Sequence, residues 1–136
     1  MTYNKKGFTI IEIMIVIMII GVLAGMAFQG FRYLQGVKLK QTQTKLAALD
    51  TMIEQYNTDI REYPSDLQEL IDGPSKPQLQ RRWARSLASQ EDIEDAWNQP
   101  FVYTLNPRGS RPPYDLYSIG PKGEDTIYSP VSQQAS

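Results

Sequence analysis

A polar stretch of seven residues opens the chain, and an apolar run from Phe8 to Phe28 follows it. The run contains one charged residue, Glu12. At a rise of about 1.5 Å per residue, a helix over this run is roughly 30 Å long, which matches the hydrocarbon core of a bilayer. The pattern therefore predicts a membrane-spanning helix over residues 8–28.

Residues 29–63 have the pattern of an amphipathic helix. Apolar side chains recur at spacings of three, four and seven with polar residues between them, which predicts a face directed toward a protein core rather than a ligand site. No proline lies between Phe8 and Tyr63. The helix is therefore expected either to continue unbroken from the apolar run or to consist of two pieces joined near Gly30 and Gly36. The expected core positions are Leu39, Leu46, Leu49, Ile53, Tyr56 and Ile60.

Tyr63-Pro64 marks the predicted end of this helix, because proline disfavours helical geometry in the residue before it. The residues from Ser65 to Gln68 fit a capping box, in which a serine and a residue three positions later satisfy backbone N–H groups at a helix start. A short helix through Ile71 is therefore expected directly after the proline.

The last third of the chain predicts strands, since aromatic and β-branched residues alternate there between turn signals. A long helix followed by a small antiparallel sheet indicates an α+β fold, with the helix packed on the sheet. The expected strands are residues 101–105, 114–119 and 126–128. The expected segments are a leader, 1–7; a transmembrane helix, 8–28; its amphipathic continuation, 29–63; an α+β region, 64–128; and a flexible tail, 129–136.

Composition narrows the classes of function. The 136 residues carry a net charge of −1 and include no cysteine and no histidine. Without these residues the chain lacks the thiol nucleophile, the usual general base and the commonest metal ligand, so we do not expect an enzyme. A membrane-anchored periplasmic hydrolase and a simple anchored binding module are the alternatives.

The basic stretch from Arg81 to Arg85 is interpreted as a solvated face with Trp83 packed inward, rather than as a nucleic-acid or lipid patch.

Glu12 is the unexpected residue of the apolar run. A carboxylate inside a membrane helix is costly and by default marks a function, with a cation as its expected partner. A cut between Gly7 and Phe8 would supply that cation, because the new α-amino group would stand four residues before Glu12. A secretory signal or a plain signal anchor would account for Lys5, Lys6 and the apolar run, but neither accounts for Glu12. The two lysines place the N-terminus in the cytoplasm and the C-terminal part across the membrane.

The stretch from Lys6 to Glu12 resembles the cleavage and methylation site of the type IV pilin superfamily. The resemblance implies that a prepilin peptidase cuts after Gly7, removes the leader and methylates Phe8, the new first residue. Glu12 then occupies the fifth mature position, where this superfamily carries a glutamate. Gly7 and Phe8 are thus the expected processing residues, and Glu12 is the expected assembly residue.

Three further stretches of the chain lie at Ile53–Pro64, Asp95–Tyr103 and Tyr114–Gly123. They resemble the major pseudopilins of type II secretion systems, with departures at Glu62, Ala96 and Asn98. The resemblance implies a homo-oligomeric helical filament that stands in the periplasm, is anchored by one helix in the bacterial inner membrane and drives export of folded proteins. The implied partners are the prepilin peptidase, minor pseudopilins and an inner-membrane secretion platform, with no nucleic acid. A minor pseudopilin, or a pilin for motility, adhesion or DNA uptake, is the alternative within the superfamily.

The same resemblance implies a calcium site, and the sequence departs from the family there. Lys122 stands where the family has an aspartate, so one oxygen ligand is lost and a repulsive charge is added. A turn closed by a salt bridge from Lys122 to a neighbouring acid is the alternative. The expected calcium residues are Leu116, Ser118, Glu124 and Asp125.

Overall fold

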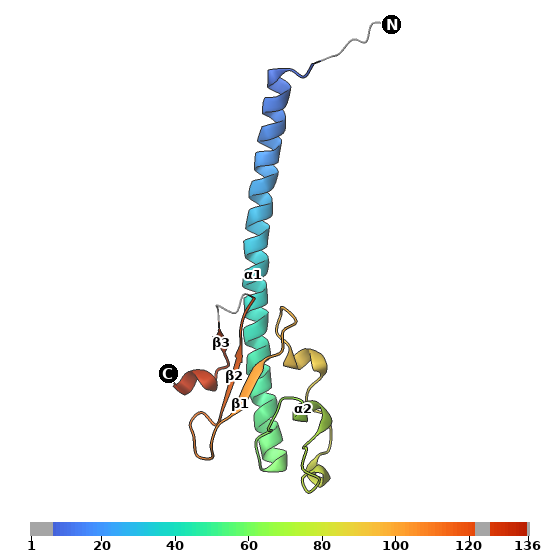
Figure 1. Cartoon of the computed structure of the whole chain (residues 1–136), viewed down its shortest axis with the longest axis vertical. Helices are drawn as coiled ribbons and strands as arrows, with labels where there is room; N and C mark the ends of the chain where they lie inside the picture. The colour runs from blue at the N-terminus through green and yellow to red at the C-terminus, as the bar shows by residue number, and fades with distance from the viewer. Residues whose placement is uncertain (1–6, 122–125, 136) are drawn as a thin grey trace. The chain divides into compact units, whose positions relative to one another are not determined.

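The computed structural model of the chain describes residues 7–121 and 126–135. One long helix, α1 (Ile10–Ile60), is followed by short helical segments and a three-stranded antiparallel sheet (Figure 1). This order confirms the predicted α+β fold class. The chain divides into two compact units, Met1–Val37 and Lys38–Ser136.

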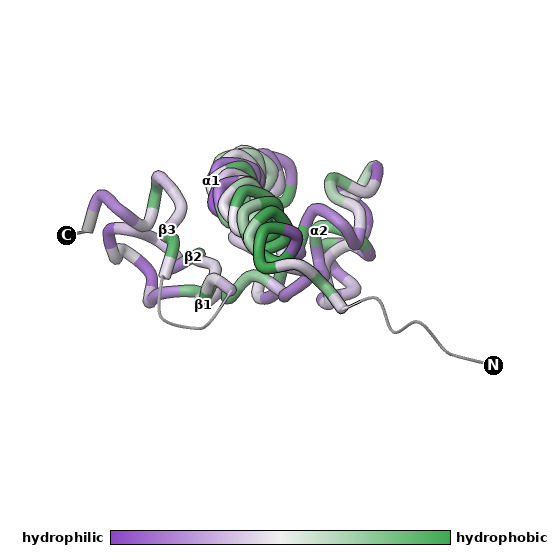
Figure 2. Tube along the Cα trace, turned by 90° about the horizontal axis from the view of Figure 1, so that it is seen from above, coloured by the Kyte–Doolittle hydropathy of each residue, from purple (hydrophilic) through white to green (hydrophobic). Residues whose placement is uncertain are grey.

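In the first unit, apolar side chains are exposed on every face of α1. The exposed fraction is 83% for Ile10, 57% for Ile20 and 62% for Phe31. Figure 2 shows this part of the helix as a hydrophobic tube. The helix runs through Gly30 and Gly36 without interruption, so the structure has the unbroken form of the two that the sequence allows.

The second unit contains the sheet, whose strands lie within the three predicted stretches. Strand β1 (Val102–Leu105) pairs with β2 (Tyr114–Ser118), and β2 pairs with β3 (Ile127–Tyr128). Alternate side chains of β2 are buried, which is the pattern of a strand with one face on a core. The buried residues of β2 are Tyr114, Leu116 and Ser118.

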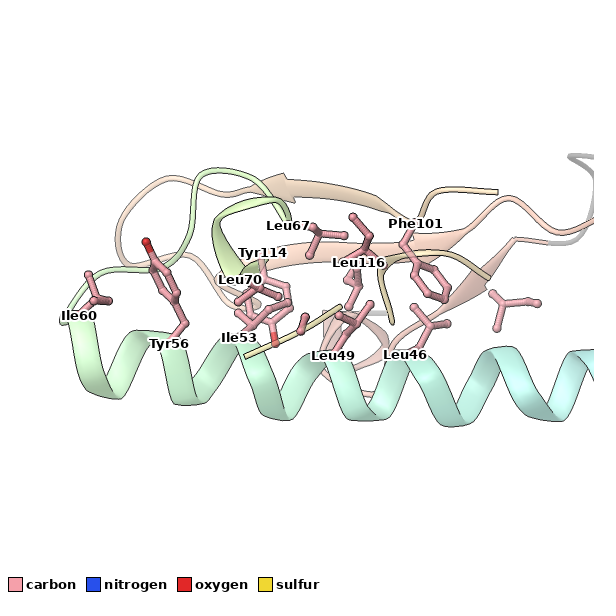
Figure 3. Packing of buried hydrophobic residues seen from close by; sticks show 13 residues of the cluster. Leu46, Leu49, Ile53, Tyr56, Ile60, Leu67, Leu70, Phe101, Tyr114 and Leu116 are labelled. Carbon is pink, nitrogen blue, oxygen red and sulfur yellow. The ribbon is translucent and has the colours of Figure 1, made fainter. Parts of the chain in front are cut away.

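The core of the second unit lies between the sheet and the C-terminal half of α1. Figure 3 shows the α1 side chains directed toward those of β2 and of the segments before β1. The predicted stripe is fully buried from Leu46 onward, but Leu39 is 41% exposed. The prediction for Leu39 is wrong because the buried face of α1 begins at Thr42, one turn later. The buried stripe residues are Leu46, Leu49, Ile53, Tyr56 and Ile60.

Helix α1 ends at Ile60 rather than at Tyr63. Arg61 has a positive φ of 70°, a conformation that terminates a helix. The guanidinium of Arg82 donates to the carbonyl of Ile60 at 3.1 Å. Two features outside the Tyr63-Pro64 signal therefore set the end of the helix.

The predicted capping box after Pro64 is wrong in its partner. The short helix α2 (Glu69–Asp72) has no side-chain hydrogen bond at its N-cap, Gln68. Ser65 instead donates its N–H and its hydroxyl to the carboxylate of Glu69, at 3.0 and 2.9 Å. Ser65 thus bonds to a residue four positions later, rather than three as predicted, and the helix begins at Glu69 instead of directly after Pro64.

Two 3₁₀ segments, η1 (Gln80–Arg82) and η2 (Gln90–Ile93), follow α2. Trp83, directly after η1, is half-buried and its ring lies 5.9 Å from that of Tyr56. The inward packing of this tryptophan is as predicted. Arg81 and Arg85, on either side of it, are exposed.

The C-terminal segment is docked rather than forming the flexible tail that we expected. It contains a 3₁₀ segment, η3 (Ser132–Ala135), and Ser129 and Ser132 are buried. The backbone N–H of Leu116 donates to the Ser132 hydroxyl at 2.8 Å. The N–H of Val131 donates to the Asp50 carboxylate at 3.1 Å. Partners far away in the sequence hold this polar segment in place.

Candidate processing and assembly site

The start of α1 is built around Thr9. The N–H of Glu12 donates to the Thr9 carbonyl at 3.1 Å and to the Thr9 hydroxyl at 3.3 Å, and the N–H of Ile13 donates to the same carbonyl. Thr9 therefore caps the helix in the manner of an N-cap threonine. Gly7 and Phe8 stand before the cap, outside the helix, and both are exposed.

The Gly7–Phe8 peptide bond is accessible in the structure. It lies in a non-helical, exposed segment directly before the first helical turn. A Cβ added to Gly7 would meet no atom within 4 Å, so no contact in the part of the chain that the structure describes requires glycine there. A requirement for glycine at this position would come from another protein.

Glu12 projects from the first turn of α1, where the positive end of the helix dipole favours a carboxylate. Its side chain is exposed. Within residues 7–121 and 126–135, the single ion pair is that between Lys76 and Glu62. In this part of the chain, Glu12 thus has no cationic partner of its own.

An apolar helical surface surrounds Glu12 and continues along the first unit. The most apolar 18-residue window of α1 has a mean hydropathy of 2.7 and none of it is buried, so the helix is long and apolar enough to cross a membrane. Glycines interrupt the apolar side chains at Gly21 and Gly25, where an added Cβ would meet nothing within 4 Å. This surface is suited to lipid or to other apolar helices.

In the second unit, hydrogen bonds join the three stretches that carry the pseudopilin resemblance. The Tyr103 hydroxyl donates to the Pro64 carbonyl at 2.7 Å, which ties the second stretch to the first. The Ser118 hydroxyl donates to the Asp95 carboxylate at 2.6 Å, which ties the third stretch to the second. These residues are therefore structural in this chain.

Asp95 organises the turn that leads into β1. It is 2% exposed, and its Oδ1 accepts the N–H groups of Trp97 and Gln99, each at 2.9 Å. The adjacent N–H of Ala96 donates to Thr42 in α1 at 3.2 Å. The carboxylate thus stabilises a turn and anchors it beside the helix.

Only part of the expected calcium site, Leu116 and Ser118, lies in the residues that the structure describes. The carbonyl of Leu116 accepts the N–H of Ser129 at 2.9 Å, and the Ser118 hydroxyl is bonded to Asp95. Glu124 and Asp125, like Lys122, lie outside the described residues. No group of three acidic, histidine or cysteine side chains in residues 7–121 and 126–135 could hold a metal. Calcium wants six to eight oxygens, and two of the four expected ligand residues are not among those described, so the calcium site stays a prediction.

Two buried carboxylates were missed by the sequence reasoning. Asp50 is 6% exposed and accepts the Tyr114 hydroxyl and the Val131 N–H. It occupies the apolar face of α1, four residues after Leu46 and three before Ile53, and this position could have indicated its burial. No such indication exists in the sequence for Glu69, because its serine partners come from separate loops before and after α2.

Glu69 accepts five hydrogen bonds, from Ser65, Ser75 and the Tyr56 hydroxyl. Burial alone would raise the pKa of Glu69, but the hydrogen bonds from Ser75 and Ser65 outweigh it and lower the pKa to about 2. The carboxylate is therefore ionised at neutral pH. It holds together the loops on both sides of α2.

Comparison with known proteins identifies two matching regions. The family described as type II secretion system (T2SS), protein G, matches residues 30–128. The prokaryotic N-terminal methylation motif matches residues 2–28, which include the Gly7–Phe8 bond and Glu12. Together the two matches cover both units of the chain.

Individual relatives are similar over nearly the whole chain. The type II secretion system core protein G of Escherichia coli (strain K12) is 35% identical over 130 residues, which span 90% of this chain and 86% of the relative. The core protein G of Pseudomonas aeruginosa is 30% identical over 126 residues, 90% of this chain and 87% of that protein. The Vibrio cholerae core protein G is 29% identical, over 90% and 84%. No solved structure matches the chain significantly.

Proposed function

The chain belongs to the type II secretion system protein G family, and we propose on this basis that it is the major pseudopilin of such a system. It polymerises into a periplasmic filament, the pseudopilus, whose growth drives export of folded proteins. The first unit is its membrane anchor and later its filament core. The second unit is the folded part that faces the periplasm.

The observation that carries this proposal is the exposed apolar surface of α1 in the first unit. Large apolar side chains from Phe8 to Val37 are between 47% and 83% exposed. Burying one such side chain contributes about 1.5–3 kcal/mol, so the surface needs a cover. Lipid covers it while the subunit is a single-pass protein of the inner membrane, and the same helices of other copies cover it in the filament.

Processing fits the geometry of the N-terminus. A prepilin peptidase cuts the exposed bond between Gly7 and Phe8 and methylates Phe8. The cap made by Thr9 lies on the retained side of the cut, so α1 keeps its first hydrogen bonds. The new α-amino group is four residues from Glu12, which is one helical turn.

Glu12 acts in assembly through that amine. A charge in an apolar helix bundle is strongly penalised when unpaired and tolerated when paired. The carboxylate of one copy and the Phe8 amine of a neighbour neutralise each other only when the two helices are in register. Pairing therefore selects correctly docked subunits.

The proposal is for a structural subunit rather than an enzyme. The whole sequence has neither histidine nor cysteine. The carboxylates that are buried within residues 7–121 and 126–135 are Asp50, Glu69 and Asp95, and each accepts hydrogen bonds that hold the fold. Minor pseudopilins and the inner-membrane platform are the partners that a filament subunit of this kind requires.

The first test is the mass and N-terminal sequence of the protein isolated from its native membrane. We expect residues 1–7 to be absent and Phe8 to carry one methyl group. Electron microscopy of cells that overproduce the full chain with its secretion system is expected to show pseudopili. An intact Met1, or a cut at another bond, would contradict the proposal.

A further inference from the structure

A cavity of about 490 Å³ lies in the second unit, at the end of α1. It is bounded by the last turn of the helix, by Lys76 and by the loop that joins β1 to β2. Cavities of roughly 300–1,000 Å³ are large enough to hold a ligand or several side chains of a partner. Its charged lining residues are Arg61, Glu62, Lys76 and Arg108.

The charge of this cavity is positive. Lys76 and Glu62 form an ion pair and cancel. Arg61 and Arg108 are exposed, and neither makes an ion pair within the described ranges 7–121 and 126–135. The hydrogen bond from Lys76, and then the charges of Lys76 and Arg108, lower the pKa of Glu62, so this acid stays ionised. With three cations against one acid, the lining has a net charge of +2.

A strongly acidic segment lies at the other end of the second unit. Four of the five residues from Glu91 to Asp95 are acids. Lys45 of α1 donates to the backbone carbonyls of Glu91 and Glu94 at 2.7 and 2.9 Å. The Lys45 ammonium is thus bound by carbonyls and forms no ion pair with the exposed side chain of Glu91.

The basic cavity and the acidic segment are separated along α1. Lys45, beside the acidic segment, is 16 residues before Arg61, which is about 24 Å of helix. In Figure 1 the segment before β1 and the loop after it lie toward opposite ends of the sheet. The two charged surfaces therefore cannot meet in one copy.

We propose that the basic cavity of one copy receives the acidic segment Glu91–Glu94 of a second copy, with the Glu91 carboxylate between Arg61 and Arg108. Surfaces of opposite charge at opposite ends of one unit form a heterologous, head-to-tail contact. Such contacts generate open helical filaments when the rotation does not close. The proposal rests on the proposed function, because it names one contact by which the filament grows.

Cross-linking tests the contact directly. The chain has no cysteine, so every thiol product comes from an introduced residue. We would express the full chain with Pro107→Cys and Gln90→Cys together, which are exposed neighbours of Arg108 and Glu91 and leave both charges in place, and treat isolated pseudopili with a bis-maleimide. A spacer is needed because an Arg–Glu contact holds the Cα atoms beyond the ~7 Å limit of a disulfide. A ladder of multimers is expected. Each single variant, and Gln90→Cys combined with Gln134→Cys, are the controls and are expected to give none.

Charge reversal gives a second readout. Arg108→Glu and Glu91→Arg are each expected to lower the yield of pseudopili about tenfold, and the double variant is expected to restore most of it. Arg111→Glu is the matched control, because Arg111 is exposed in the same loop and does not line the cavity. Resistance of the full-length variants to limited proteolysis verifies that they fold.

The outcomes separate this inference from the proposed function. Normal pseudopili without a ladder, together with no rescue by the double variant, would overturn the contact and leave the filament intact. Loss of secretion with normal pseudopilus yield would also overturn it, because the cavity would then serve another partner. A wild-type chain that is never cut after Gly7 and forms no filament would overturn the proposed function itself.

Discussion

Tyr114 in β2 donates its hydroxyl hydrogen to the carboxylate of Asp50 in α1, with 3.0 Å between the two oxygens, and both residues are buried. The second carboxylate oxygen of Asp50 accepts the N–H of Val131. One side chain thus joins the long helix to the middle strand of the sheet and to the C-terminal segment. Burial, and then the charge of Asp50, raise the pKa of Tyr114, so the hydroxyl remains a donor at neutral pH.

Replacing Asp50 is therefore expected to be costly. Asp50→Ala leaves the Tyr114 hydroxyl and the Val131 N–H without acceptors, and we expect the free energy of unfolding to fall by about 3 kcal/mol. Tyr114→Phe removes one donor and leaves the second bond of Asp50 in place, so a loss of about 1–2 kcal/mol is expected. Denaturant unfolding of the full chain in detergent measures both. Asp59→Ala, an exposed change on the same helix, is the control, and an equal effect there would contradict the assignment.

Glu69 makes the free energy of unfolding depend on pH in the acid range. Its pKa is about 2 in the folded chain against 4.5 as the ordinary value. Because the folded pKa is lowered, the stabilisation is complete above about pH 5 and is lost as the pH falls toward 2. The shift corresponds to a loss on the order of 3 kcal/mol. Unfolding measured between pH 7 and 2 is expected to show this decline in the wild type.

Glu69→Gln isolates that contribution from the other carboxylates. The variant is expected to be less stable at pH 7 and to have a flatter dependence on pH between 5 and 2. Ser75→Ala removes one hydroxyl donor and is expected to give an intermediate curve. Parallel curves for the wild type and Glu69→Gln would show that Glu69 does not titrate in this way.

Gly73 is required by its backbone and by its neighbour. Its φ is +92°, and an added Cβ would lie 2.8 Å from Cδ1 of Trp83. Gly73→Ala is expected to destabilise the fold by about 2–3 kcal/mol, through backbone strain and through displacement of the indole. Gly109 is the matched control, because its φ of +90° is similar but nothing lies within 4 Å of the added atom. Gly109→Ala is expected to cost only about 1 kcal/mol, and equal losses would exclude a role for Trp83.

Glu12→Ala separates assembly from folding. The hydrogen bonds of Glu12 in α1 are made by its backbone, so its loss leaves the second unit unchanged. We expect normal cleavage after Gly7, normal thermal unfolding and no pseudopili by electron microscopy. Gln29→Ala, at another exposed polar position of the same helix, is the control. Normal pseudopili from Glu12→Ala would remove the assembly role that we give to this residue.

Elements with a strong local period could be predicted from the sequence. The stripe from Leu46 to Ile60 and the alternation in β2 each repeat over several residues, and each is buried as expected. The motif around Gly7 and Glu12 could also be recognised from the sequence, because its residues are contiguous. The family match to residues 2–28 covers the same stretch.

Features made by distant partners were not predictable. The end of α1 depends on Arg82, which is 22 residues after Ile60. The docking of Ser132 and Val131 depends on β2 and on Asp50, with sequence separations of 16 and 81 residues. Local composition marks the C-terminal segment as polar, but it cannot reveal a buried acceptor elsewhere in the chain. The charged cavity at the end of α1 was likewise not predictable, because three separate segments of the chain form it.

The position of the Thr9 cap has a consequence for the order of events in the cell. The proposed cleavage would remove residues that precede the cap, and the first hydrogen bonds of α1 use Thr9 or later residues. We therefore expect the uncut and the cut chain to share the same helix start, so that the proposed maturation requires no refolding. An uncleaved subunit would therefore already be folded in the membrane, and cleavage would be the step that commits it to assembly.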